Sequence, residues 1–141
     1  MFLKEASSRF EDKCQDFNSG SVQETWIDPN LDDTNKFQIS EFSAHFNSVG
    51  RGKGIATYFR EGFFVQEDVV QPNYQMTKIS SVEIEIINVY RSSNAPVSFL
   101  DDLQKLINCE SPTHIIGDFN ICYKSERDNK IIKKLEEMGF R

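Results

Sequence analysis

Two periodicities of apolar residues divide the chain into strands and helices. Apolar–polar alternation, or a short apolar run between turn residues, predicts strands at 21–26, 42–46, 55–59, 63–70, 74–79, 82–90 and 113–117. Apolar residues at helical spacing predict helices at 2–17, 97–108 and 125–138. Polar and proline-containing stretches at 28–36 and 92–96 indicate loops, and the glycine-rich stretch 50–54 indicates a turn.

The order of these elements predicts a single α+β domain over residues 1–141. Strand follows strand through most of the chain, which favours antiparallel pairing, and the few helices then pack on the sheets as separate layers. The run 82–90 begins with strict alternation and ends almost continuously apolar, which is typical of a strand entering the centre of a sheet. A chain of 141 residues is long enough for one modest core.

Composition narrows the classes of function. The net charge of −6 argues against a large basic surface for nucleic acid, although an acidic metal site contributes negative charge that a bound cation offsets. The three cysteines have no C-x-x-C spacing, so we expect free thiols and no zinc site. The sequence has no membrane-spanning apolar run and no secretory signal, so we expect an intracellular protein, nuclear or cytoplasmic, without a membrane partner.

The stretch Ile-Ile-Gly-Asp-Phe-Asn at 115–120 is the strongest candidate for chemistry. In a strand, Asp118 and Asn120 would project from the same face, with Phe119 opposite. A carboxylate beside a carboxamide at the end of a buried strand suits the binding of a water or phosphate near a hard cation. The alternative is an ordinary strand followed by an Asp/Asn turn.

Three further stretches each have a functional and a structural interpretation. Glu24, at the end of an apolar-flanked strand, is either a metal ligand or a solvated strand-end carboxylate. Arg51 and Lys53 lie in a glycine-rich turn that lacks the spacing of a nucleotide P-loop but could face a phosphate backbone. Tyr90 and Arg91 end the central strand, where they either donate to a phosphate or cap the core and meet solvent.

The two histidines do not suggest a catalytic group. His45 and His114 each lie within a predicted strand, and neither has metal-ligand neighbours or a Ser-His-Asp or Cys-His arrangement. We therefore expect both to be exposed strand residues.

Taken in order, four motifs resemble the endonuclease/exonuclease/phosphatase superfamily, the DNase I-like fold. They are QETW at 23–26, GKGIATYFR at 52–60, INVYRSSN at 87–94 and IIGDFN at 115–120. The middle two are most similar to the endonuclease domains of transposable elements such as Helitrons and non-LTR retrotransposons. The resemblance implies an α/β sandwich of two packed, mainly antiparallel sheets flanked by helices.

The resemblance also implies roles for individual residues. Glu24 matches the magnesium-binding glutamate, and Asp118 matches the aspartate that orients the attacking water. Asn120 and Tyr90 match residues that contact the scissile phosphate, and Arg91 and Asn94 lie in the matching loop. The implied activity is Mg²⁺-dependent (or Mn²⁺-dependent) hydrolysis of phosphodiester bonds in DNA.

The sequence also departs from the family. The first strand, with its metal-site asparagine, and the C-terminal strands, with a catalytic histidine–aspartate pair, have no counterpart between residues 1 and 141. We therefore expect a partial domain, incomplete at both ends and inactive or weakly active as an enzyme. Missing strands would leave a sheet edge exposed, so self-association there is expected.

Two other functions stay compatible with the same residues. One is a non-catalytic interaction module, or pseudoenzyme remnant, whose exposed sheet edge pairs with another chain. The other keeps the fold but acts on a phosphoinositide, a nucleotide or another small phosphoester. The acidic net charge favours small phosphoesters, whereas the basic turn at 50–54 and the loop at 90–94 favour nucleic acid.

Overall fold

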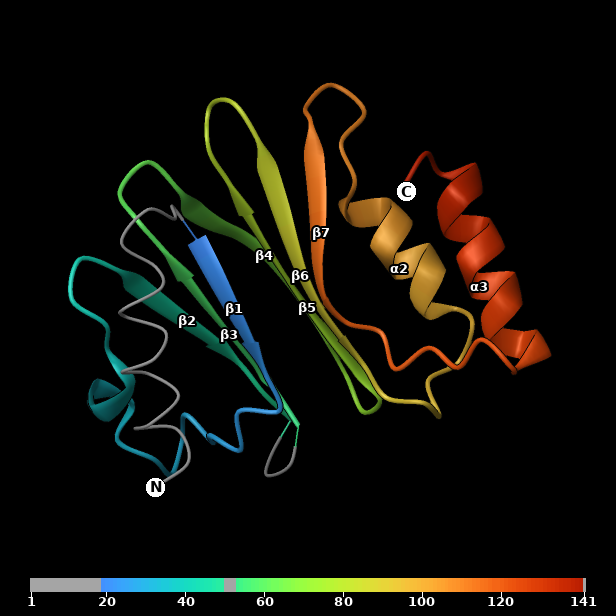
Figure 1. Cartoon of the computed structure of the whole chain (residues 1–141). Coiled ribbons are helices and arrows are strands. Elements are labelled where there is room, and N and C mark those ends of the chain that lie inside the picture. Colours follow the sequence, from blue (N-terminus) through green and yellow to red (C-terminus); the bar gives the residue numbers. More distant parts are fainter. Residues whose placement is uncertain (1–18, 50–52, 141) are drawn as a thin grey trace.

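A computed structural model describes residues 19–49 and 53–140 of the chain (Figure 1). Within these residues the fold is α+β, as the sequence predicts. The strands are β1 (Ser19–Gln23), β2 (Ser43–Asn47), β3 (Ile55–Phe59), β4 (Phe64–Gln71), β5 (Tyr74–Ser80), β6 (Glu85–Arg91) and β7 (Thr113–Asp118). The helices are the 3-10 helix η1 (Thr34–Phe37) and the α-helices α2 (Phe99–Leu106) and α3 (Glu126–Glu137). The predicted helix at 2–17 lies outside the described residues.

The strands form two sheets, one with three strands in the order β1-β3-β2 and one with four in the order β4-β5-β6-β7. All neighbouring strands are antiparallel except β6 and β7, which are parallel. The two sheets face each other, because β1 contacts β7 while β3 contacts β5 and β6. Figure 1 shows α2 and α3 together on the other face of the four-stranded sheet. The prediction of two packed, mainly antiparallel sheets is confirmed.

The face of the four-stranded sheet that meets the helices is mostly apolar. In α2, buried Phe99, Leu100, Leu103 and Leu106 recur at helical spacing and form one stripe toward the sheet. Ser125 begins α3 as an N-cap, since its side chain accepts a hydrogen bond from the Asp128 N–H. The buried cluster under the two helices consists of Tyr74, Met76, Ile87, Val89, Ala95, Phe99, Leu100, Leu103, Leu106 and Ile131.

The interface between the two sheets changes character along its length. At one end it is apolar, with Phe59, Ile79 and Ile86 in a buried cluster. Toward the other end, buried polar side chains replace them, and Asn88 and Thr57 are almost fully enclosed. The Asn88 Nδ2 donates to Thr57 Oγ1 at 3.0 Å, which joins β6 to β3 across the interface. Buried polar groups are tolerated only when they are hydrogen-bonded, so this end of the interface has a specified geometry.

The outer face of the three-stranded sheet is also packed. Ile39, Ala56 and Tyr58 form a buried cluster there, and the Tyr58 hydroxyl donates to the Phe37 carbonyl at 2.8 Å. The segment that contains η1 therefore lies against this sheet. No helix within residues 19–49 and 53–140 is long and apolar enough to cross a membrane.

Candidate functional site

Three strands end together at the polar end of the sheet interface. The Tyr90 hydroxyl, from β6, donates to Glu24 Oε1 at 3.2 Å, although the two residues are 66 positions apart. Tyr90 is also the register partner of Asp118 in the parallel β6–β7 pair. Residues from three sequence motifs therefore meet at one edge, where β1, β6 and β7 end (Figure 1).

Glu24 lies just beyond β1 rather than within a strand. The predicted strand at 21–26 is too long, because β1 ends at Gln23 and Glu24 has φ +51°. The next residue is anchored instead to the turn after β2, since the Thr25 N–H donates to the Gly54 carbonyl at 3.3 Å. Glu24 is exposed while Thr25 is buried. The carboxylate therefore stands at the rim of the site.

Asp118 and Asn120 do not continue a strand side by side. β7 ends at Asp118, and Asn120 has φ +46°, so the predicted alternation of faces stops before Asn120. Asp118 Oδ1 accepts a hydrogen bond from the Asn120 N–H at 2.9 Å, which closes an Asx turn. The Asn120 Nδ2 donates to the Arg91 carbonyl at 2.7 Å. The Asp/Asn turn interpretation thus describes the local backbone, and the same turn keeps both side chains at the site.

The environment of Tyr90 keeps its phenol protonated. Burial raises the pKa of Tyr90, and the negative charges of Glu24 and Asp118 raise it further. A protonated phenol is a hydrogen-bond donor at neutral pH, and here it donates to the Glu24 carboxylate.

Arg91 occupies a different place from the one predicted. Its side chain is completely buried on the helix side of β6, with Nη1 donating to the Phe119 carbonyl at 2.9 Å. Nη2 lies 3.2 Å from Asp128 Oδ1 in an ion pair, and the guanidinium lies over the Phe99 ring, 5.3 Å from its centroid. This burial argues against the predicted contact of Arg91 with substrate. The side chain instead holds the segment after Asp118 against α2 and α3.

Asp128 completes this anchor, and its role could not be foreseen from the sequence. Its Oδ2 accepts a hydrogen bond from the Cys122 N–H at 2.9 Å. That bond and the adjacent Arg91 lower the pKa of Asp128 below its ordinary value, against the opposing effect of burial. An acidic residue in the first turn of a helix is common on its own account, so nothing in the sequence singles it out.

The other predicted phosphate contacts are spread around the same end. The Lys53 Nζ donates to the Pro72 carbonyl at 2.6 Å and so ties the β2–β3 turn to the β4–β5 turn. Asn94 is exposed in the turn after β6. Arg51 lies outside the described residues.

Gln23 and Asn88 form a contact that the sequence motifs do not predict. The Gln23 Nε2 donates to Asn88 Oδ1 at 2.9 Å and so links β1 to β6 across the two sheets. Gln23 immediately precedes Glu24, and Asn88 lies two positions before Tyr90. The contact therefore sets the position of one carboxylate relative to the phenol. The only signal in the sequence is a polar residue within an apolar strand.

Both histidines of the chain lie away from Asp118. His114 is exposed near the start of β7, as predicted. The prediction of an exposed residue is wrong for His45, which is half-buried with Nε2 at 2.6 Å from Asp68 Oδ2. That pair bridges β2 and β4 at the opposite edge of the sheets, because β2 and β4 are edge strands on the side away from β1 and β7.

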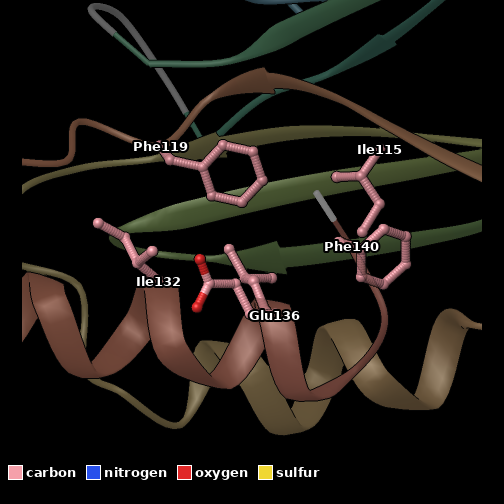
Figure 2. A pocket seen from close by; sticks show the side chains of 6 residues that line it. Ile115, Phe119, Ile132, Glu136 and Phe140 are labelled. Atoms are coloured by element: carbon pink, nitrogen blue, oxygen red, sulfur yellow. The ribbon is translucent and has the colours of Figure 1, made fainter.

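A pocket of about 260 Å³ lies on the other side of β7, between this strand and α3. Figure 2 shows Phe119, Ile115 and Phe140 around it, with Ile132 and Glu136 from α3 below. Because neighbouring residues of β7 point to opposite faces, Phe119 enters this apolar pocket while Asp118 faces the sheet interface. The pocket is therefore separate from the polar site.

The donor set at the site fits a magnesium ion held largely by water. Within the described parts of the chain, no three His, Cys, Asp or Glu side chains gather into a metal-binding group. Mg²⁺ usually keeps several waters and uses one or two carboxylates, unlike metals held in a full protein cage. Glu24, which accepts the Tyr90 hydrogen bond, and Asp118, the register partner of Tyr90, are the carboxylates at this edge.

Comparison with known proteins adds no relative: no family model matches this chain, and no curated protein matches it.

Proposed function

We propose that this chain is a DNase I-like domain whose polar edge binds and slowly hydrolyses a phosphodiester of DNA. The observation that carries the proposal is the Tyr90–Glu24 hydrogen bond of 3.2 Å beside Asp118, the β7 partner of Tyr90. Three of the four motifs that resemble the superfamily contribute to this one edge. The α+β architecture with two facing sheets supports the same assignment.

Each residue at the edge has a chemical task in this proposal. Asp118 accepts hydrogen bonds from, and so orients, the attacking water. The Tyr90 phenol, kept protonated by its raised pKa, donates to a phosphate oxygen that competes with Glu24 for the same hydrogen. Glu24 and Asp118 are the residues that would hold Mg²⁺, and the bound ion supplies Lewis-acid stabilisation of charge on the phosphate. Asn120 has a second amide hydrogen besides the one donated to the Arg91 carbonyl, and in this proposal that hydrogen is donated to the phosphate.

Neither histidine can serve as the proton donor at this edge, since His45 is paired with Asp68 and His114 lies at the far end of β7. Leaving-group protonation by a positioned side chain usually contributes about 10²- to 10⁴-fold to a rate. We therefore propose slow turnover rather than efficient cleavage.

The experiment is nicking of supercoiled plasmid and cleavage of an abasic-site duplex with Mg²⁺ or Mn²⁺. We expect weak cleavage by the chain and at least a tenfold loss in Asp118→Ala and in Glu24→Gln. His114→Ala is the matched control, because it alters the same strand away from the site. Equal product from the chain and from Asp118→Ala would overturn the nuclease assignment. Cleavage of small phosphoesters with none of DNA would move the substrate to that class.

A second candidate function is association with another copy of the chain. Within the described residues β7 is the edge strand of its sheet, and the apolar pocket beside it is lined by Ile115, Phe119 and Ile132. An edge strand next to apolar side chains is suited to pairing with a second strand. We expect a dimer by light scattering at high concentration, weakened by Ile132→Ser but not by the exposed neighbour Lys133→Ser. A monomer at all concentrations would exclude this function.

A further inference from the structure

The inference concerns Trp26, which follows Glu24 by two positions. Its side chain is 62% exposed, although tryptophan is the largest apolar side chain and is usually well covered. Its backbone has φ +56°, in the left-handed region that bulky residues rarely adopt.

The neighbours of Trp26 hold it in this position. Thr25 and Ile27 are each 2% exposed, so the chain is fixed on both sides of the indole. The Thr25 N–H donates to the Gly54 carbonyl at 3.3 Å, and Thr25 Oγ1 accepts from the Ile27 N–H at 3.5 Å. Because these two residues point inward, Glu24 and Trp26 both turn outward beside the candidate phosphate site.

The backbone strain concentrates around this site. Positive φ at a residue with a side chain costs free energy and persists only where the surroundings impose it, commonly at functional positions. Of the four such residues in the described part of the chain, Glu24, Trp26 and Asn120 lie in the two segments that carry the site. The fourth, Glu41, lies in the segment before β2.

The second segment that leaves the site also carries an exposed aromatic ring. Tyr123 follows Asn120 by three positions and is 79% exposed. Within the described residues, the other large exposed aromatic side chain is Phe64, at the start of β4. Exposed aromatic rings therefore stand on both segments beside the carboxylates and the phenol.

We propose that Trp26 is a stacking platform for an unpaired nucleobase next to the phosphate at Glu24, Tyr90 and Asp118. This inference rests on the proposed function and narrows its substrate to DNA with an unstacked base, such as a single strand, a gap or a frayed end. A base inside a duplex has both faces covered by its neighbours, whereas an unpaired base offers a face to an aromatic ring. The net charge of −6 gives little general attraction to DNA, so stacking supplies affinity that charge does not.

The chain is suited to a direct test, because Trp26 is its only tryptophan. The Asp118→Ala variant, which the proposed function expects not to cleave, is titrated with an oligothymidylate of roughly eight nucleotides, within the usual site size. We expect saturable quenching of the tryptophan fluorescence. An oligomer of equal length made only of abasic sugar-phosphate units should leave the fluorescence unchanged.

Affinity for a dye-labelled oligothymidylate, measured by anisotropy in the same Asp118→Ala background, gives the second readout. Trp26→Ala should weaken binding by about tenfold or more, as loss of one base–aromatic stack does, and Trp26→Phe should retain most of it. Val82→Ala is the matched control, because Val82 is fully exposed in the β5–β6 turn at the other end of the sheets.

The outcomes separate the stacking inference from the function on which it rests. Equal affinity of Trp26→Ala, or equal quenching by the abasic oligomer, would overturn stacking, while plasmid nicking that depends on Asp118 would still support the nuclease. Absence of oligothymidylate binding would also overturn stacking, and if in addition no nicking depends on Asp118, both proposals fail together.

Discussion

The two faces of the four-stranded sheet bury different chemistry. Under α2 and α3 most buried residues are aliphatic or aromatic, and their packing has no preferred direction, apart from the buried ion pairs Arg91–Asp128 and Lys78–Glu85. On the opposite face, toward β1 and β3, buried amides and hydroxyls such as Asn88 and Thr57 join the sheets by hydrogen bonds. Directional bonds specify relative position better than apolar contact does. The helix face therefore supplies stability, and the inter-sheet face places Glu24 beside Tyr90.

The largest expected effect comes from removing an aromatic ring from the helix face. Phe99 is fully buried and lies beneath the Arg91 guanidinium. We expect Phe99→Ala to lower the free energy of unfolding by about 4 kcal/mol, because it leaves a cavity in the core. Urea denaturation measures this loss, with Val82→Ala as a control expected within about 0.5 kcal/mol of the parent. A loss below about 1 kcal/mol would mean that this face does not carry the stability.

A slightly smaller loss of stability is expected when Gly117, in β7, is substituted. A Cβ there would lie 1.9 Å from the Val89 carbonyl oxygen of the neighbouring strand, and φ is +141°. We expect Gly117→Ala to cost about 3 kcal/mol, since β6 and β7 must separate or distort. Gly62→Ala is the matched control, because Gly62 has φ +101° with no atom within 4 Å of the added Cβ. Equal losses in the two variants would attribute the effect to backbone strain alone.

On the inter-sheet face, Asn88→Ala is expected to cause a moderate loss of stability and a larger loss of activity at the site. Asn88→Ala leaves Gln23 and Thr57 without a hydrogen-bond partner that they now share. We expect a cost of about 2 kcal/mol in urea denaturation. We also expect the Mg²⁺-dependent nicking rate to fall by more than it does in Phe99→Ala when both are assayed well below their unfolding midpoints. The reverse order would contradict the division of labour between the faces.

The helix face also predicts a sensitivity to alkaline pH. Burial and the adjacent Asp102 raise the pKa of Tyr74 to about 12, from an ordinary value of 10.0. The stabilisation is therefore complete below pH 10 and is lost as the pH rises toward about 12, because the unfolded phenol ionises first. We expect Tyr74→Phe to flatten the fall in the unfolding midpoint over this range. An unchanged slope would show that Tyr74 does not control it.

The smallest expected effect is at the acidic end of the pH range, on the inter-sheet face. Burial would raise the pKa of Asp68, but hydrogen bonds from His45 and Thr77 outweigh it and lower the pKa below the ordinary value of 3.8. This stabilisation is present above pH 3.8 and is lost as the pH falls through the lower folded value. Asp68→Asn should therefore reduce the difference in unfolding midpoint between neutral and acidic pH. A pH profile identical to that of the parent would contradict this role.

Most strands and both described α-helices are predictable from the apolar pattern, because each has one face in a core. β3, for example, is predicted at 55–59 and observed as Ile55–Phe59. The end of β1 is not predictable in this way. The apolar flanks of Glu24 continue to Trp26, yet the backbone leaves the strand at Glu24 because Thr25 is held by Gly54. That contact joins segments far apart in the chain, so no local pattern carries it.

The arrangement of the site residues is likewise only partly predictable from the sequence. The resemblance assigns Tyr90 and Asp118 to one phosphate site, and the parallel β6–β7 register places the two residues side by side. The burial of Arg91 has a signal in the sequence, since alternation in β6 places it on the face of Ile87 and Val89. Its partner Asp128 has no such signal, because the ion pair depends on how α3 docks.

Both faces of β6 carry residues with specific contacts, and this limits where the sequence can gain or lose residues. Adjacent residues Tyr90 and Arg91 face opposite sides of the sheet, one at the site and the other in the anchor to α3. A codon inserted or deleted within 85–91 would move every later side chain of this strand to the opposite face of the sheet. The turn before β6, where Val82 is fully exposed, has no such restriction. Length variation among descendants of this sequence should therefore collect at 81–84 and be purged from the strand.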